Sequence, residues 1–324
     1  MPSLKEIKGR IASVNSTRKI TSAMKMVASS KLHHAQVAIQ NMLPYEELLE
    51  HILKSFLAAE AEAQTIFDQE RPVKRAALVV MTSNSSLCGG FNANTIKMML
   101  HAVEEYDKTI GRDNVEIYPI GRKVYEKAKK MGLAVQGEYS ALADQPNVQD
   151  CIEIAMELGK KFSEGQIDKV ELIYHHFKSA GSQILTRKTF LPIDVQSELN
   201  ADKERDLETV IATKESQEYL KKRGEKERSR EGEQEVKPLN DNFIVEPDMN
   251  TVLSQLLPKL AHLSLYTALL DSNASEHAAR MVAMQTATDN ADELLRELNL
   301  QYNKSRQQAI TSELLDIVGG SVNN

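Results

Sequence analysis

The sequence predicts an α/β domain inserted into a long antiparallel coiled coil that the two ends of the chain form together. Heptad repeats of apolar and small residues occupy both ends of the 324 residues, and short apolar runs alternate with helical patterns between them. The predicted segments are an N-terminal shaft helix (1–60), an α/β domain (73–195), a charged and partly disordered insertion (196–240) and a C-terminal shaft helix (248–324).

The C-terminal repeat runs from about Thr251 to Val318. One set of heptad positions extends from Leu253 to Ala309 and the interleaved set from Leu256 to Ser312, and nearly all of them are apolar or small. No proline or glycine falls between Pro258 and Gly319. At about 1.5 Å per residue this predicts a helix on the order of 90 Å long, and such a seam requires a partner helix along its length.

The N-terminus supplies that partner. Ser3 and Glu6 fit a capping box at a helix start, and apolar or small residues recur every seventh position from Ile7 to Phe56. Pro44 is expected to kink or briefly interrupt this helix. Close approach of the two helices is expected at small residues, which are Ala28 and Ala35 facing Ala274 and Ala291.

The middle of the chain changes to a pattern of short strands and helices, which predicts a Rossmann-like layer domain with a largely parallel sheet. The expected strands are 76–81, 115–120, 169–176 and 183–191, and the expected helices are 93–106, 122–131 and 147–162. The last two strands are joined across Ser179 to Ser182, which predicts an antiparallel hairpin.

A Gly-containing turn follows the first strand, and its candidate functional residues are Cys88, Gly89, Gly90 and Asn92. A doubly wound fold would bind phosphate there, but the G-x-G-x-x-G and G-x-x-x-x-G-K-[ST] spacings are missing, so we interpret it as a tight turn for close packing. Cys88 is interpreted as a buried, unreactive thiol. Only two cysteines occur, which indicates a reducing compartment.

The adjacent histidine pairs His33–His34 and His175–His176 do not predict a metal site, because neighbouring side chains on a helix or strand point in different directions. His277 falls on the shaft seam, where it either sets the register or contacts a partner. The sequence therefore predicts no catalytic, cofactor or metal site.

The first 31 residues are strongly basic, with Glu6 as their one acidic residue. Either this is a solvated helix face or an acidic protein partner binds it. From Gln307 to Asn324 only Glu313 and Asp316 are charged, which indicates that another protein encloses this end. The net charge of −6 argues against nucleic acid as a partner, and no apolar run is long enough to span a membrane.

Four separated motifs, in this order, resemble the gamma subunit of bacterial F-type ATP synthases. They are the segment from Ile11 to Lys31, the turn from Leu87 to Asn92, the segment from Ala274 to Ala291, and the ending from Tyr302 to Gly320. The resemblance implies a central rotor stalk that is not itself an enzyme. Its implied partners are three alpha and three beta subunits, the epsilon subunit and the c-ring, at the cytoplasmic face of the bacterial inner membrane.

The resemblance also implies contacts with the alpha/beta ring. Met24 would lie opposite the beta-subunit levers, and the basic residues Lys8, Arg18 and Lys25 would complement their acidic side chains. Near the C-terminus the implied contacts to the beta catch region are Arg306, Gln307, Thr311 and Glu313.

Two departures from the family pattern stand out. Asn84-Ser85-Ser86 replaces an acidic–basic–glycine run, which puts one charged beta contact in doubt. The excursion at 198–237 is longer than typical bacterial members need, and our hypothesis for it is either a species-specific brake on ATP hydrolysis or a mobile decoration. Two alternatives to the rotor stay open from the residues alone, a ligand-binding enzyme with a dimerisation arm and a coiled-coil adaptor.

Overall fold

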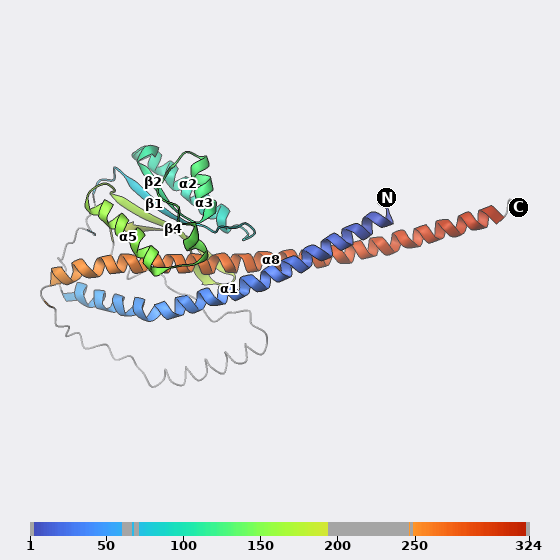
Figure 1. The fold of residues 1–324 in the computed structure, drawn as a ribbon, viewed down its shortest axis with the longest axis horizontal. Helices are drawn as coiled ribbons and strands as arrows, with labels where there is room; N and C mark the ends of the chain where they lie inside the picture. Colours follow the sequence, from blue (N-terminus) through green and yellow to red (C-terminus); the bar gives the residue numbers. More distant parts are fainter. Residues whose placement is uncertain (1–2, 60–66, 68–70, 194–245, 247–248, 322–324) are drawn as a thin grey trace, which may run out of the picture. The chain divides into compact units, whose positions relative to one another are not determined.

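The computed structural model describes residues 3–59, 67, 71–193, 246 and 249–321 (Figure 1). These residues form two compact units, one made of residues 1–28 and 280–324 and the other of residues 29–279. Each terminal helix takes part in both units. The predicted charged insertion at 196–240 lies outside the described residues.

Both predicted shaft helices are confirmed, α1 at Leu4–Ala59 and α8 at Met249–Ser321. The Ser3 hydroxyl oxygen accepts the Glu6 backbone N–H at 3.3 Å, as the predicted cap requires. Of the two outcomes expected at Pro44, an interruption does not occur, because α1 continues through this residue, whereas the expected kink stays a prediction. A proline removes one helical hydrogen bond, and here the flanking residues Met42 and Leu49 pack into the core of the second unit and hold the helix together.

In the first unit α1 and α8 run antiparallel, since Arg18 pairs with Asp292 and Thr21 pairs with Thr288 further back along α8. The two threonine hydroxyl oxygens lie 2.8 Å apart. Heptad positions of both helices form the buried seam, and these are Ile7, Thr21, Ala28, Met284, Ala291 and Leu298. The predicted coiled coil is therefore confirmed.

The second unit contains a five-stranded sheet in the order β3-β2-β1-β4-β5. The strands are β1 (Ala76–Met81), β2 (Val115–Ile120), β3 (Ala134–Val135), β4 (Lys169–Ser179) and β5 (Ser182–Leu191). All neighbours pair in parallel except β4 and β5, which form the predicted antiparallel hairpin. The sequence did not predict β3, because its two residues are too few to show a pattern.

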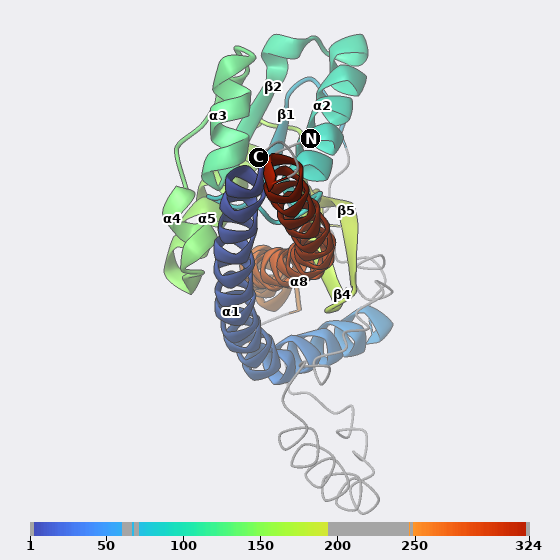
Figure 2. The same cartoon turned by 90° about the vertical axis from the view of Figure 1, so that its right-hand side faces the viewer.

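Helices cover both faces of this sheet (Figures 1 and 2). On one face lie α2 (Phe91–Thr109) and α3 (Arg122–Lys130); on the other lie α5 (Val148–Ser163), the short α4 (Ser140–Asp144) and part of α8. A short 3-10 helix, η1 (Arg112–Asn114), precedes β2. Along β1 the side chains alternate between the two cores, as a strand buried on both faces requires.

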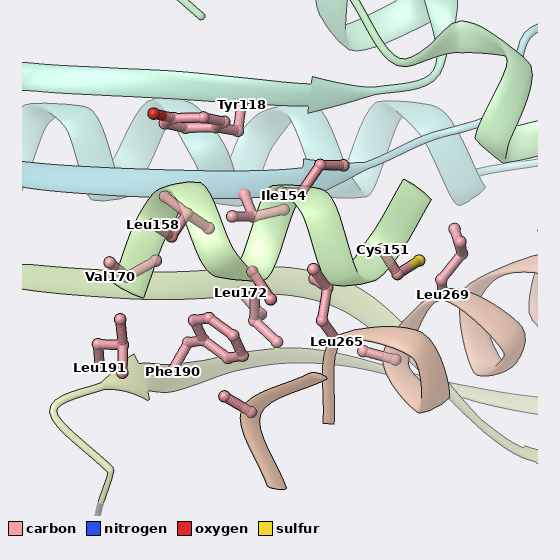
Figure 3. Packing of buried hydrophobic residues seen from close by; sticks show 14 of the residues in the cluster. Tyr118, Cys151, Ile154, Leu158, Val170, Leu172, Phe190, Leu191, Leu265 and Leu269 are labelled. Carbon is pink, nitrogen blue, oxygen red and sulfur yellow. The ribbon is translucent and has the colours of Figure 1, made fainter. Parts of the chain in front are cut away.

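The core beneath α5 also contains side chains of α8. Figure 3 shows Leu269 of α8 beside Cys151 of α5, and Leu265 and Leu269 belong to the same buried cluster as Ile154 and Leu158 of α5 and Leu172 of β4. Part of α8 is therefore a core element of the α/β domain.

Gly121, between β2 and α3, has a φ of 104°. A Cβ atom added there would lie 2.0 Å from the Thr82 carbonyl oxygen, at the end of the neighbouring strand. Only glycine therefore allows the chain to leave β2 this close to β1.

Gly121→Ala is expected to lower the free energy of unfolding of the full chain by about 3 kcal/mol, because the substitution adds both a backbone strain and a steric overlap. The measurement is urea unfolding followed by circular dichroism. Gly9→Ala is the control: Gly9 lies in α1 with nothing within 4 Å of an added Cβ, so alanine should raise stability by up to about 1 kcal/mol. Equal effects of the two substitutions would contradict this account.

Candidate functional site

The predicted contact residues on α1 differ in how available they are. Lys8 is exposed, and Met24 and Lys25 are partly buried beside the seam. Arg18 already has a partner within the chain, because its guanidinium lies 2.9 Å from the Asp292 carboxylate. Both side chains are about 40% exposed (39% and 41%), so solvent screens this ion pair.

The contact residues predicted near the C-terminus, Arg306, Gln307, Thr311 and Glu313, are all exposed. The pairing of Arg18 with Asp292 and of Thr21 with Thr288 sets an antiparallel register in which the start of α1 lies opposite roughly residue 306 of α8. Within the described residues of this unit, the end of α8 therefore extends past α1 (Figure 1).

This unpaired end is apolar. Ile310, Leu314 and Leu315 are 45%, 57% and 66% exposed, although a helix in water normally keeps leucine and isoleucine on a buried face. A second set of exposed apolar residues lies further along α1, where Ile20 and Met26 are 59% and 66% exposed. Exposed apolar side chains gathered on one element mark a protein interaction surface.

The turn after β1 is held by the chain's own side chains. The Asn92 side-chain oxygen accepts the Ser83 N–H at 3.0 Å, and its amide nitrogen donates to the Ser85 carbonyl at 3.1 Å and lies 3.1 Å from the Cys88 sulfur. Gly89 has a φ of 58°, and Gly90 precedes α2 as its N-cap. The predicted residues of this turn thus meet in one structural network.

Asn84, where the family pattern has a charged run, is also engaged within the chain. Its amide nitrogen donates to the Ser140 carbonyl and the Asp144 carboxylate, both at 2.7 Å. Its side-chain oxygen accepts the Arg122 backbone N–H at 2.8 Å. Asn84 therefore links the end of β1 to α3 and α4 instead of presenting a charge to solvent.

The histidine pair on β4 points to opposite faces of the sheet, as predicted. His175 stacks on Phe91 of α2 with ring centroids 4.4 Å apart, and burial lowers the pKa of His175 to about 4, so the ring is neutral at neutral pH. His176 faces α8, where its Nδ1 lies 2.7 Å from the Asp271 carboxylate. Among the described residues no group of three metal-binding side chains comes together.

Comparisons with known proteins match this chain over nearly its whole length, including both terminal helices and the α/β domain. The family described as ATP synthase matches residues 3–322. The ATP synthase gamma chain of Phocaeicola vulgatus is 52% identical over 322 residues, covering 99% of this chain and 100% of the relative. The gamma chain of Bacteroides thetaiotaomicron is 50% identical with the same coverage.

The chain belongs to the ATP synthase gamma chain family. As a member it is the non-catalytic rotor subunit of an F-type ATP synthase, peripheral to the membrane, as the sequence motifs indicated. The described helices include none that is both long and apolar enough to cross a bilayer. The relatives match along their whole length. Residues 198–237 lie outside the described residues, and the hypothesis of a species-specific brake on ATP hydrolysis or a mobile decoration stays a prediction.

Solved structures support the fold. A chain from the Euglena gracilis mitochondrial ATP synthase has a TM-score of 0.59 at 17% identity, covering 99% of this chain and 94% of that chain. A chain from the Tetrahymena thermophila mitochondrial ATP synthase central stalk and c-ring has a TM-score of 0.53 at 23% identity, covering 83% and 99%. The predicted fold class is confirmed.

Sequence reasoning missed the Arg18–Asp292 pair and the polar contacts of His176. The Arg18–Asp292 pair had a signal in the sequence. Arg18 interrupts the apolar heptad positions of the N-terminal helix, and Asp292 lies next to the heptad position Ala291 of the C-terminal helix. The contacts of His176 had no signal in the sequence, because they depend on which part of α8 packs against β4.

The two thiols are expected to be unreactive in the folded chain. Cys88 and Cys151 are 1% and 0% exposed, and burial raises the pKa of the Cys151 thiol to about 12. Since the folded pKa is raised, the thiolate stays scarce through pH 8–9, where a free cysteine with a pKa of about 8.5 becomes reactive. Alkylation rates measured from pH 7 to pH 10 should therefore stay low for Cys151, whereas in urea both thiols should react rapidly. Fast alkylation of folded Cys151 at pH 8.5 would contradict the buried site.

Proposed function

We propose that this chain works as the rotating shaft through which ion flow drives ATP synthesis. A c-ring turned by protons or sodium ions would rotate the chain inside a ring of three alpha and three beta subunits. The observation that supports this most directly is the exposed apolar end of α8, which requires an enclosing partner that a free protein in water does not provide. The closed intramolecular seam leaves that end outside the coiled coil.

The shaft contacts form two groups in this proposal. The apolar end, with Ile310, Leu314 and Leu315, would turn inside the upper part of the ring, since apolar contacts have no preferred direction. Arg306, Gln307, Thr311 and Glu313 are exposed on the same part of α8 and would contact the beta catch region.

The second group lies on α1. Lys8, Met24 and Lys25 would meet the acidic levers of the beta subunits, where charge complementarity orients the partners. Arg18 would contribute less, because Asp292 already neutralises it.

Coupling follows from the asymmetry of the shaft. A beta subunit that meets the basic side of α1 has different contacts from one that meets α8, so each shaft angle stabilises a different beta conformation. Rotation of the shaft then moves each beta site through its states in turn, without any chemistry on this chain.

The α/β domain would stand with the epsilon subunit on the c-ring, at the cytoplasmic face of a bacterial inner membrane. The turn of Cys88, Gly89, Gly90 and Asn92 would then be structural, since its polar atoms bond to the chain itself. A stand-alone enzyme or an adaptor has no observation in its favour.

The proposal is tested by purifying the tagged chain from native membranes and determining subunit stoichiometry by mass spectrometry. Three copies each of two nucleotide-binding subunits for every copy of this chain are expected. Recovery of the chain alone or as a homodimer would overturn the proposal.

Leu315→Asp is expected to reduce assembly with the alpha and beta subunits by tenfold or more, because a buried carboxylate without a partner loses several kcal/mol of solvation. Gln308→Asp is the matched control on the same exposed stretch of α8. Assembly is measured as the amount of chain that elutes with the hexameric ring in size-exclusion chromatography. Equal losses for the two variants would show that the apolar character of the end does not matter.

Arg18→Ala and Asp292→Ala separate an intramolecular role of Arg18 from a partner contact. If the ion pair is the main role of Arg18, both variants should lower the rate of ATP synthesis equally and by less than about fivefold, as expected for a half-exposed pair worth at most about 1 kcal/mol. A much larger loss for Arg18→Ala than for Asp292→Ala would instead establish a contact of Arg18 with the ring.

A further inference from the structure

Residues 267–278 of α8 are buried on every side of the helix. Their exposed fractions range from 0% for Ala274 and Ser275 to 8% for Asn273. A helix enclosed in this way is normally apolar all round. Here the stretch is mostly polar, and its polar members are Thr267, Asp271, Ser272, Asn273, Ser275, Glu276 and His277.

One side of this stretch is bonded to β4. The Asp271 carboxylate lies 2.7 Å from Nδ1 of His176, and the Ser275 hydroxyl donates to the His175 carbonyl at 3.2 Å. Asp271 and Ser275 are four residues apart, so they lie on the same face of α8. The imidazole of His176 points at that face because even-numbered residues of β4, such as Leu172 and Tyr174, face the α5 and α8 side of the sheet.

The opposite side is bonded to α4. The Asn273 side-chain amide donates to the Ala143 carbonyl at 2.8 Å. Asn273 is two residues from both Asp271 and Ser275, which at 3.6 residues per turn places it about 200° around the helix from each of them. The α/β domain thus holds α8 from two opposite sides by hydrogen bonds.

Stability alone does not explain polar side chains at these positions. Apolar residues of similar volume at buried ion-pair positions are often as stabilising or more so. Apolar contacts are non-directional and permit a helix to turn or slide against its neighbours, whereas a hydrogen bond fixes distance and angle. A buried polar residue in a helical seam is known to set register in this way.

We propose that Asp271, Asn273 and His176 are the positioning residues that transmit torque from the α/β domain to the shaft. Together they lock the angle and the axial register of α8, so that a turn imposed on the domain becomes an equal turn of the helix. Apolar packing alone, at Leu265 and Leu269, would let the helix slip under load. This inference rests on the proposed rotor function and adds the place where torque enters the shaft.

The test compares two activities of the assembled enzyme in membrane vesicles. ATP hydrolysis by the detached ring with this chain needs the shaft only inside the ring, whereas ATP-driven ion pumping needs torque to pass through the α/β domain. The variants are Asp271→Leu with Asn273→Leu, which keep side-chain volume and remove the hydrogen bonds, and Asp271→Asn, which keeps an acceptor for His176.

The double variant loses two hydrogen bonds, each worth about 1 kcal/mol or a factor of about five, and is expected to pump at least about fivefold fewer ions for each ATP hydrolysed. Hydrolysis by its detached ring should stay within about twofold of the unmodified enzyme, a change below 0.5 kcal/mol. The single variant Asp271→Asn, which keeps an acceptor for His176, should pump as well as the unmodified enzyme. His101→Leu, at an exposed histidine of α2 on the other face of the sheet, is the control and should leave both activities unchanged.

Three results would overturn the inference. These are normal pumping per ATP in the double variant, an equal loss of pumping and hydrolysis, and a failure of every variant, Asp271→Asn included, to enter the complex. The last two would show that the contacts serve stability only. If the rotor function itself is wrong, the unmodified chain will not co-purify with the ring or support pumping, which separates the two failures.

Discussion

The structure depends on one helix whose surroundings change along its length. In the second unit residues 267–278 of α8 are buried on all sides, as Asp271 and Ser275 show, and in the first unit α8 shares a single seam with α1. A helix with one continuous hydrogen-bond ladder can cross both environments, because its backbone is satisfied internally and only the side chains need to adapt. The sequence of α8 therefore changes character along its length while its conformation does not.

This constraint explains why the α/β domain and the shaft cannot be treated as independent parts. Leu265 and Leu269 contribute to the same core as Ile154 and Leu158, so removing the shaft helix would open the domain. Leu49 of α1 belongs to the same cluster. A subunit that carries torque needs such a joint, since two domains connected by a single flexible linker could rotate against each other.

At the carboxyl edge of the sheet, polar side chains at the end of β1 bond to other parts of the chain. In such folds ligands bind at the carboxyl ends of the parallel strands. Here Asn84 and Asn92 occupy the end of β1 and bond to nearby backbone groups, and the Cys88 sulfur lies in the same network. These two asparagines therefore link the end of β1 to the neighbouring elements of the domain.

Periodicity alone was sufficient to predict the shaft helices, the strands from Ala76 and Val115, and the antiparallel hairpin, because each pattern persists over enough residues to average out exceptions. Pro44 alone could not decide between a kink and an interruption of α1; the helix is continuous there, and Met42 and Leu49 on either side pack into the core. The motifs pointed to the family correctly, but they could not place the contacts of Arg18 or Asp271. Both contacts join residues far apart in the sequence, and only the three-dimensional register between elements determines them.

Residues that contact a partner and residues that hold the protein's own parts together differ in how easily they can be found from the sequence. Residues that contact partners, such as those at the exposed end of α8, stand out because they violate the expected burial of apolar side chains. Residues that hold the protein's own parts together do not stand out in this way, because buried and exposed polar side chains look alike in a sequence. In α8 the run from Asp271 to His277 has the composition of a solvated surface, and it lies at the centre of the joint.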